Sequence, residues 1–347
     1  MSILSLAEEL KPAGVEARVA RRVECVAVAT ATACGLCGGG RGHPLEERDR
    51  DGRPLRVVVC DRCGVVRNDP IPTAEELSRF YAESYRLEYK RTREPKRRHA
   101  ARYFPVVAAQ IEKHADLYGP ARDVLDVGSG SGEFLFLMQA LGKTARGLEP
   151  SRDYAEFCRT KLGLEVETGE IGGYEPKGKF DHIRLSHVVE HLRDPAGSLR
   201  TVAGWLREGG TIYVQVPSFE AYCRTKSAGG MFHFGHIYTF DADSFDRLLA
   251  AAGLEVVRRV GPTVAFARRA ACGPVDAGEA APALIAAKQA DYAVHKAGKA
   301  QRRSRVARLL GKLRKRWAEW RRMGAAGDFR AIGERQAEAL RRRLGVA

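Results

Sequence analysis

Two pairs of cysteines have the spacing of a metal site. Cys34 and Cys37 form one C-x-x-C-G turn, and Cys60 and Cys63 form a second one after 22 intervening residues. Each turn can place two thiolates about 2.3 Å from one ion, so the two turns together supply the tetrahedral ligand set that zinc prefers. A filled site of four cysteines leaves no open position for catalysis. We therefore expect structural zinc, and the module lacks the aromatic and basic surface of a nucleic-acid-binding ribbon.

A glycine-rich segment from Asp126 to Gly132 is the second candidate site, and it follows a short apolar run. Glycine tolerates positive φ angles and lets a ligand approach the backbone, while the helix that follows points free N–H groups at the ligand. Glu149 comes 19 residues after Gly130. A carboxylate there can accept both ribose hydroxyls of an adenosine ligand. Taken alone, this pair would serve a dinucleotide equally well.

The glycine spacing, G-x-G-x-G behind Asp126, resembles motif I of class I S-adenosylmethionine-dependent methyltransferases rather than the G-x-G-x-x-G of dinucleotide folds. The segment from Asp181 to Pro195 is similar to the fourth-strand segment of that superfamily, and Gly209-Gly210 precedes the next strand. The resemblance covers about residues 90–270 and implies S-adenosylmethionine as cofactor, lying across the carboxyl ends of the first, second and fourth strands.

By this resemblance Asp126 lies near the methionine part of the cofactor, Glu149 holds the ribose, and Gly169 with Glu170 contacts the adenine. The full set of expected cofactor-binding residues is Asp126, Gly128, Ser129, Gly130, Gly132, Glu149, Pro150, Gly169, Glu170, Ser186 and His187. The alternative for Asp126 is that it only caps the turn. Glu190 and His191 follow the expected strand of the segment from Asp181 to Pro195. Their alternative is that they only orient their loop.

Methyl transfer from a sulfonium is an in-line displacement, so the enzyme must align the acceptor and, for a hydroxyl, remove its proton. His233 and His236 lie among aromatic residues after the expected fifth strand and are the candidate catalytic residues, because histidine suits base work near neutral pH. His236 in H-I-Y-T-F resembles the histidine of H-F-S-Y-F in sugar C-methyltransferases, but Gly235 replaces the glutamate found there. We therefore expect O-methylation of a sugar or similar hydroxyl. The alternative is that His236 only hydrogen-bonds within its loop.

Short apolar strands alternate with amphipathic helices from Asp123 onward, which predicts an α/β fold with a parallel sheet. Combined with the resemblance, this predicts a Rossmann-like seven-stranded methyltransferase sheet with helices on both faces. Thr73 and Glu76 predict a capping box. The expected strands are 124–127, 145–148, 180–185 and 211–216, followed by a closing hairpin of 256–260 and 264–267.

The chain is expected to comprise an N-terminal extension (1–33), a zinc module (34–70), a helical cover (71–119), the cofactor-binding catalytic domain (120–273), a linker (274–287) and a basic helical tail (288–347). The run from Cys60 to Tyr85 resembles the N-terminal part of bacterial methyltransferases of sugar and surface-glycan pathways. In those relatives this region helps cover the acceptor. Tyr81, Tyr85 and Tyr89 are therefore expected to face the substrate.

The positive charge is concentrated in the tail. Lys288 to Ala347 contains 18 basic and 5 acidic residues and so carries +13 of the net +15. Within the tail, apolar residues from Val306 to Trp320 recur at helical spacing between arginines and lysines, which is typical of an amphipathic cationic helix. One hypothesis is that this helix docks on an anionic membrane surface where lipid-linked glycans are built. The alternative is a solvated helix or an oligomer contact.

Composition excludes several other classes of protein. Hydrophobic residues make up 44% and charged residues 29%, which is ordinary for a folded domain. The sequence has no apolar run of membrane-spanning length and no apolar stretch typical of a signal peptide, so we expect a cytoplasmic enzyme, peripheral at the inner membrane face if the tail docks there.

Besides sugar C-methylation, two rival functions stay open. The first is RNA methylation, because a zinc knuckle ahead of such a domain also resembles a bacterial guanine-N1 ribosomal RNA methyltransferase; the absence of a D/N-P-P-[FYW] signature makes nucleic acid the less favoured partner. The second is a non-catalytic cofactor-binding scaffold, which the intact glycine turn and Glu149 disfavour.

Overall fold

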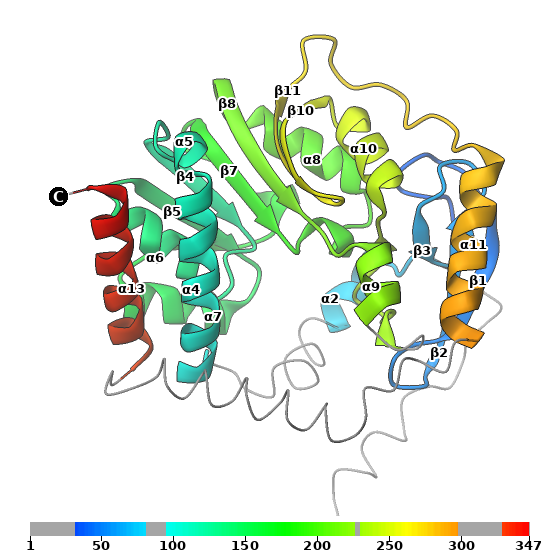
Figure 1. Ribbon diagram of the computed structural model, residues 1–347, viewed down its shortest axis with the longest axis horizontal. Coiled ribbons are helices and arrows are strands. Elements are labelled where there is room, and N and C mark those ends of the chain that lie inside the picture. The colour runs from blue at the N-terminus through cyan, green and yellow to red at the C-terminus, as the bar shows by residue number, and fades with distance from the viewer. Residues whose placement is uncertain (1–31, 81–94, 226–229, 298–327, 347) are drawn as a thin grey trace, which may run out of the picture. The chain divides into compact units, whose positions relative to one another are not determined.

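The computed structural model describes residues 32–80, 95–225, 230–297 and 328–346 (Figure 1). Tyr81, Tyr85 and Tyr89, the apolar stripe from Val306 to Trp320 and nearly all of the N-terminal extension lie outside the described residues, so the expectations for them stay predictions. Among the described residues, no helix combines the length and hydropathy needed to cross a membrane.

Seven strands of the described chain form the main sheet, in the order β10-β11-β8-β7-β4-β5-β6. The five strands from β8 to β6 run parallel, and β11 and β10 are antiparallel at one edge. This confirms the predicted fold class. The strands span Asp123–Val127 (β4), Thr144–Glu149 (β5), Glu165–Thr168 (β6), Phe180–Ser186 (β7), Leu206–Gln215 (β8), Leu254–Gly261 (β10) and Val264–Arg269 (β11).

Helices cover both faces of this sheet because successive residues of each strand point to opposite faces. On one face, α4 (Arg97–Lys113), α6 (Glu133–Ala140) and α13 (Phe329–Leu344) share a buried cluster with Val124 and Phe266. On the other face, α8 (Pro195–Gly204) and α10 (Ala242–Ala251) pack over Leu125 and Val127. The shorter helices are α2 (Ala74–Arg79), α5 (Ala115–Tyr118), α7 (Arg152–Phe157), the π-helix η2 (Cys158–Leu162), the 3-10 turns η3 (Ile171–Gly173) and η4 (Val189–His191), and α9 (Phe219–Thr225).

A smaller sheet carries the cysteine turns. Within the described ranges its order is β1-β2-β3-β9, formed by β1 (Gly42–Arg48), β2 (Pro54–Cys60), β3 (Val66–Asn68) and β9 (Tyr238–Thr239). The strand β9 closely follows His236, so the segment that carries His233 and His236 completes the sheet of the cysteine module. The predicted capping box forms at Thr73 and Glu76, at the start of α2.

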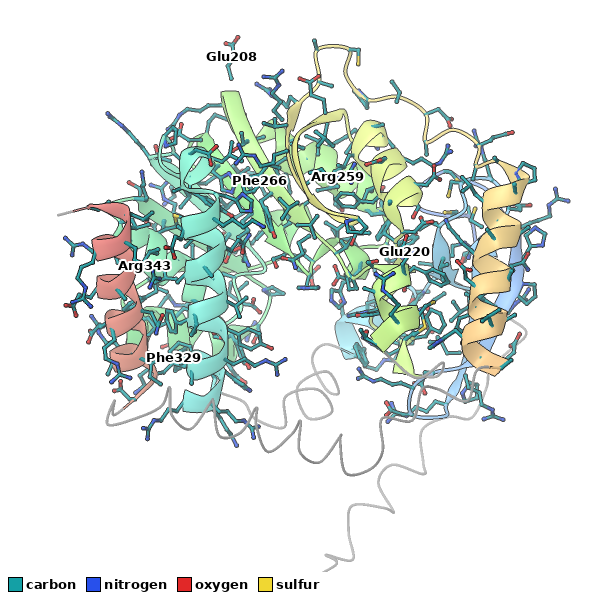
Figure 2. The ribbon with its side chains drawn as sticks, viewed as in Figure 1. Glu208, Glu220, Arg259, Phe266, Phe329 and Arg343 are labelled. Atoms are coloured by element: carbon teal, nitrogen blue, oxygen red, sulfur yellow. The ribbon has the colours of Figure 1, made fainter. Side chains whose placement is uncertain are left out.

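Both described ends of the basic C-terminal region pack on the folded body. Phe329 in α13 makes edge-on ring contacts with Phe104 and Phe157, and near the other end of this helix Arg343 lies 2.8 Å from Glu112 (Figure 2). The helix α11 (Pro282–Ala297) begins inside the segment expected as a linker and buries Ile285 and Tyr292 against the small sheet. These contacts support an intramolecular role for α11 and α13.

Candidate active site and metal centres

The glycine turn joins β4 to α6 with three residues in left-handed conformations. Gly128 has φ +70°, Gly130 +57° and Gly132 +82°. A Cβ on Gly128 would lie only 2.5 Å from a methyl of Val188, so at this position both the backbone angle and the space require glycine. The N–H of Gly128 donates to the carbonyl of Leu148 at 2.7 Å, which fixes the turn against β5.

Glu149 ends β5 and is held by the same turn. Its Oε2 accepts the N–H of Gly130 at 2.9 Å, and its Oε1 accepts the N–H of Ser151 at 3.0 Å. Each carboxylate oxygen has two lone-pair directions and can accept more than one hydrogen bond. The side chain is therefore fixed in orientation and able to receive a pair of neighbouring hydroxyl groups.

Asp126 precedes the turn and forms a buried ion pair that was not expected from the sequence. Its Oδ1 accepts a hydrogen bond of 2.9 Å from Arg184 of β7, whose guanidinium also lies 4.9 Å from the ring centre of Phe134. Its Oδ2 is buried without a hydrogen-bond partner among the described residues. Burial raises the pKa of Asp126, and the charge of Arg184 acts in the opposite direction. The sequence signal for this pair was an arginine between the apolar residues Ile183 and Leu185 of an expected strand.

The other expected cofactor residues lie at the same edge of the sheet. Because β4, β5, β6 and β7 are parallel neighbours, their carboxyl ends meet. Gly169 donates its N–H to the carbonyl of Glu149 at 3.2 Å, and Glu170 precedes η3 with an exposed side chain. Ser186 bonds to Gln215 at 3.2 Å, and His187 has a φ of +58°. The residues so brought together are Asp126, Gly128, Ser129, Gly130, Gly132, Glu149, Pro150, Gly169, Glu170, Ser186 and His187.

A cluster of imidazoles surrounds His236. Its ring centre lies 3.9 Å from that of His233 and 4.7 Å from that of His191. Burial, followed by the neighbouring His191 and His233, lowers the pKa of His236 well below its usual value. A histidine with a lowered pKa is neutral near pH 7 and can accept a proton. His233 and His236 were the expected catalytic residues, and the alternative for Glu190 and His191 was that they only orient their loop; the structure places Glu190 and His191 beside His236.

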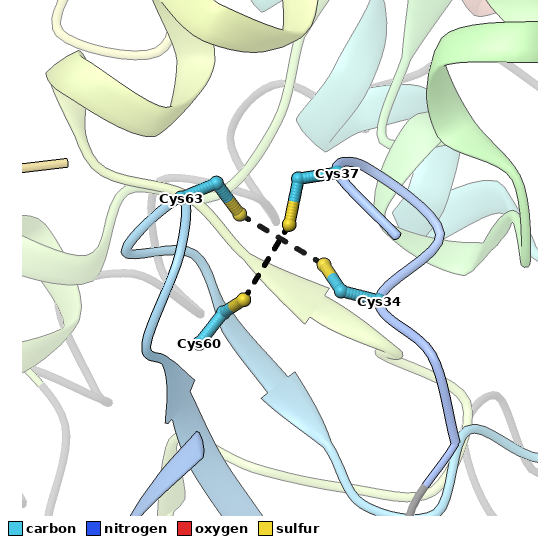
Figure 3. A group of neighbouring side chains, drawn as sticks. All are labelled: Cys34, Cys37, Cys60 and Cys63. Atoms are coloured by element: carbon cyan, nitrogen blue, oxygen red, sulfur yellow. Dashed lines mark hydrogen bonds between the residues drawn. The ribbon is translucent and has the colours of Figure 1, made fainter. Parts of the chain in front are cut away.

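The four cysteines converge as their spacing predicted (Figure 3). The sulfur of Cys34 lies 3.8 Å from that of Cys63, and the sulfur of Cys37 lies 3.6 Å from that of Cys60. Tetrahedral zinc with bonds of about 2.3 Å requires sulfur separations of about 3.8 Å. The thiol geometry therefore fits a zinc ion, and the residues that would hold it are these four.

The cysteine module and the histidine segment are held together by hydrogen bonds. Asn68 of β3 donates its backbone N–H to the carbonyl of Ile237 at 2.9 Å and its side-chain N–H to the carbonyl of Phe234 at 3.2 Å. The hydroxyl of Tyr238 accepts the N–H of Gly35 at 3.0 Å and donates to the carbonyl of Arg193 at 3.1 Å. The module therefore supports both sides of the segment that carries His233 and His236.

Comparison with known proteins matches residues 79–259 to the family described as "Methyltransferase domain". The chain is 31% identical over 110 residues to a ubiquinone biosynthesis O-methyltransferase of Vibrio parahaemolyticus, covering 30% of this chain and 46% of that protein. It is 28% identical over 145 residues to the protein of the same name from Stutzerimonas stutzeri, covering 40% of this chain and 60% of that protein. The chain thus spans only about half the length of these curated relatives.

Among solved structures, Streptomyces venezuelae DesVI matches with a TM-score of 0.39 and 20% identity, over 55% of this chain and 98% of that chain. The family match spans more than half of the 347 residues and includes the glycine turn, Glu149 and the strand that carries Arg184. The chain therefore belongs to the methyltransferase domain family.

Proposed function

We propose that the protein methylates a hydroxyl group of a sugar or other small molecule with S-adenosylmethionine as methyl donor. The cofactor half of this proposal is carried by Glu149, whose carboxylate is fixed by the N–H groups of Gly130 and Ser151 at the carboxyl edge of a parallel sheet. S-adenosylmethionine, when bound, supplies the electrophilic methyl group.

The chain's own residues would bind and orient this cofactor. Glu149 would accept hydrogen bonds from the two ribose hydroxyls. The left-handed glycines at 128 and 130 let the backbone approach the ligand without a Cβ. Asp126 lies near the end of β4, where the methionine part of the cofactor is expected. Its Oδ2 atom is buried and has no hydrogen-bond partner among the described residues.

The histidine segment would handle the acceptor. A hydroxyl acceptor must lose a proton as its oxygen attacks. The imidazole of His236 is neutral because burial lowers its pKa, and its buried Nδ1 has no hydrogen-bond partner among the described residues, so this atom can take the proton. His233, in contact with the same ring, is the second candidate base. The relatives from Vibrio and Stutzerimonas are named as O-methyltransferases, which supports oxygen as the acceptor atom. Gly235, which replaces the glutamate of the sugar C-methyltransferase pattern, also favours oxygen over carbon.

The test is methyl transfer from isotope-labelled cofactor to a panel of nucleotide-linked sugars, catechols and fractionated small molecules. We expect label in an ether-linked methyl group. His236→Asn should lower kcat about 10²- to 10⁴-fold, the usual contribution of general base catalysis, and leave cofactor affinity unchanged. His43→Asn, a change at an exposed histidine of β1, is the matched control. Label found only in RNA or in nitrogen- or carbon-linked methyl groups would contradict the proposal.

A further inference from the structure

Apart from the four cysteines, one more group of potential metal ligands occurs in the part of the chain that the structure describes: Glu190, His191 and His236. We propose that these three residues bind a divalent transition-metal ion of the zinc type, on the acceptor side of the methyltransferase site. The binding itself does not depend on the proposed function. Only the role given to the ion below rests on it.

The ligand set and its geometry fit such an ion. Two imidazoles and one carboxylate form a common set for a zinc ion that keeps an open coordination position. One ligand atom from each residue lies within 4.8 Å of those of the other two. Bonds of about 2.1 Å in a tetrahedral site require ligand atoms about 3.4 Å apart, so small side-chain rotations would close the site.

Burial gives the second observation. The side chain of Glu190 is fully buried, and its Oε2 has no hydrogen-bond partner among the described residues. The Nδ1 atom of His236 is likewise buried without a partner in the described part of the chain. Burying a carboxylate oxygen without a compensating partner is costly, and a cation coordinated by both residues would remove that cost.

The surrounding hydrogen bonds prepare the ligands for a metal. The Nδ1–H of His191 donates to the carbonyl of Gly235 at 2.6 Å, so Nε2 carries the lone pair, and this atom lies 3.9 Å from Oε1 of Glu190. His187 contacts the same carboxylate oxygen at 3.3 Å. Metal-binding histidines in proteins are usually oriented by such a bond from the second ring nitrogen.

Gly235 has a specific part in this arrangement. A Cβ at that position would lie 2.7 Å from the ring of Phe80 and 3.5 Å from the ring of His233. Glycine therefore lets its carbonyl approach His191 closely. The residue that departs from the sugar C-methyltransferase pattern is the one that orients a proposed metal ligand.

The ion would also take part in the proposed reaction. An acceptor hydroxyl bound at the open position becomes more acidic and gives its proton to His233, whose ring lies 3.9 Å from that of His236. The oxygen then forms its bond to the methyl carbon while the bond from that carbon to sulfur breaks, and the electron pair of the broken bond stays on sulfur. When the ion is bound, His236 is a ligand and no longer acts as the base, so the proton goes to His233, the second of the two candidate bases.

The experiment uses the full chain with its four-cysteine site loaded with zinc and dialysed free of excess metal. Cobalt(II) is added, unbound metal is removed by gel filtration, and zinc and cobalt are measured by mass spectrometry and visible absorption. We expect one zinc and one cobalt per chain, with a cobalt spectrum that lacks thiolate charge-transfer bands. Glu190→Gln and His236→Asn should keep the zinc and weaken cobalt binding by at least about tenfold. His43→Asn should bind both metals.

Retention of the zinc, together with unchanged affinity for S-adenosylmethionine, checks that each variant is folded. A wild-type chain that binds no cobalt at saturation would overturn the inference, as would a Glu190→Gln/His236→Asn double variant that binds it as tightly as the wild type. The two proposals fail separately. If hydroxyl groups are methylated without cobalt or another second-site metal, the proposed function stands and the ion has no role in it. If cobalt binds but no hydroxyl group is methylated, the metal site stands and the proposed function fails.

Discussion

Glu149→Gln is the substitution that best distinguishes binding of the cofactor's ribose by Glu149 from a merely structural role of the glycine turn. In the wild type both carboxylate oxygens accept a backbone N–H, at 2.9 Å from Gly130 and 3.0 Å from Ser151. A carboxamide has one oxygen, so its NH₂ group would face one of these donors, and one ribose hydroxyl would lose its acceptor. Losing one hydrogen bond to a charged group costs about 1.5 to 3 kcal/mol, which corresponds to an increase in Kd of about 10- to 150-fold.

The assay is calorimetric titration of the zinc-loaded chain with S-adenosylmethionine and with its demethylated product, S-adenosylhomocysteine. The matched control is Glu167→Gln, the same change at an exposed residue of the neighbouring strand β6. We expect the control to bind both ligands like the wild type. If the wild type binds and Glu149→Gln binds within twofold of it, Glu149 does not hold the ribose and the reasoning is refuted.

Three further predictions concern stability, each measured as the free energy of unfolding in urea. Gly128→Ala should lose about 2 kcal/mol or more, because φ is +70° and the new methyl would lie 2.5 Å from a neighbouring valine; an unchanged midpoint would show that the turn relaxes freely. Burial lowers the pKa of His182 in the folded protein to about 3, so the neutral ring contributes its full stability above pH 6.5, the ordinary pKa of histidine, and this contribution is lost as the pH falls toward 3. Between pH 7.5 and pH 5 the free energy of unfolding should therefore fall by about 2 kcal/mol. The variant His182→Gln should lack that part of the pH dependence. A pH profile of that variant parallel to the wild type would disprove the assignment. Lys288→Met breaks a buried ion pair of 2.7 Å with Asp241 and should cost about 3 to 5 kcal/mol, whereas Lys296→Met, which removes a lysine side chain that is 55% exposed, should cost less than about 1 kcal/mol; equal losses would contradict this difference.

The parts of the fold that were predictable from the sequence depend on residues close together in the chain, through their burial pattern and backbone conformation. At least half of the residues in each of β4, β5 and β7 are buried, and the turn after β4 needs glycine at left-handed positions. The strand β6 was missed because only Val166 of its four residues is buried, so it gives no apolar run. The strand β8 begins at Leu206 rather than at residue 211, because its first half includes the polar and glycine-rich residues 207–210.

The parts that were not predictable depend on contacts between distant residues. Asp126 and Arg184 come from different strands and meet only because β4 and β7 pair. His191 and His236 are 45 residues apart, and nothing in their local sequence indicates that their rings make contact. The strand β9 has two residues and forms because β3 is available to pair with it. The cysteine turns were predictable because two C-x-x-C pairs have the sequence spacing that four thiolates need to reach one metal ion.

The central claim is that the turn from Gly128 to Gly132 and the carboxylate of Glu149 form a binding site for an adenosyl sulfonium. The most direct measurement is equilibrium binding of S-adenosylmethionine to the zinc-loaded full chain. We expect saturable binding of one molecule per chain, with competition by S-adenosylhomocysteine. Folded, zinc-loaded protein that binds neither molecule, or that binds a nicotinamide dinucleotide in their place, would contradict it.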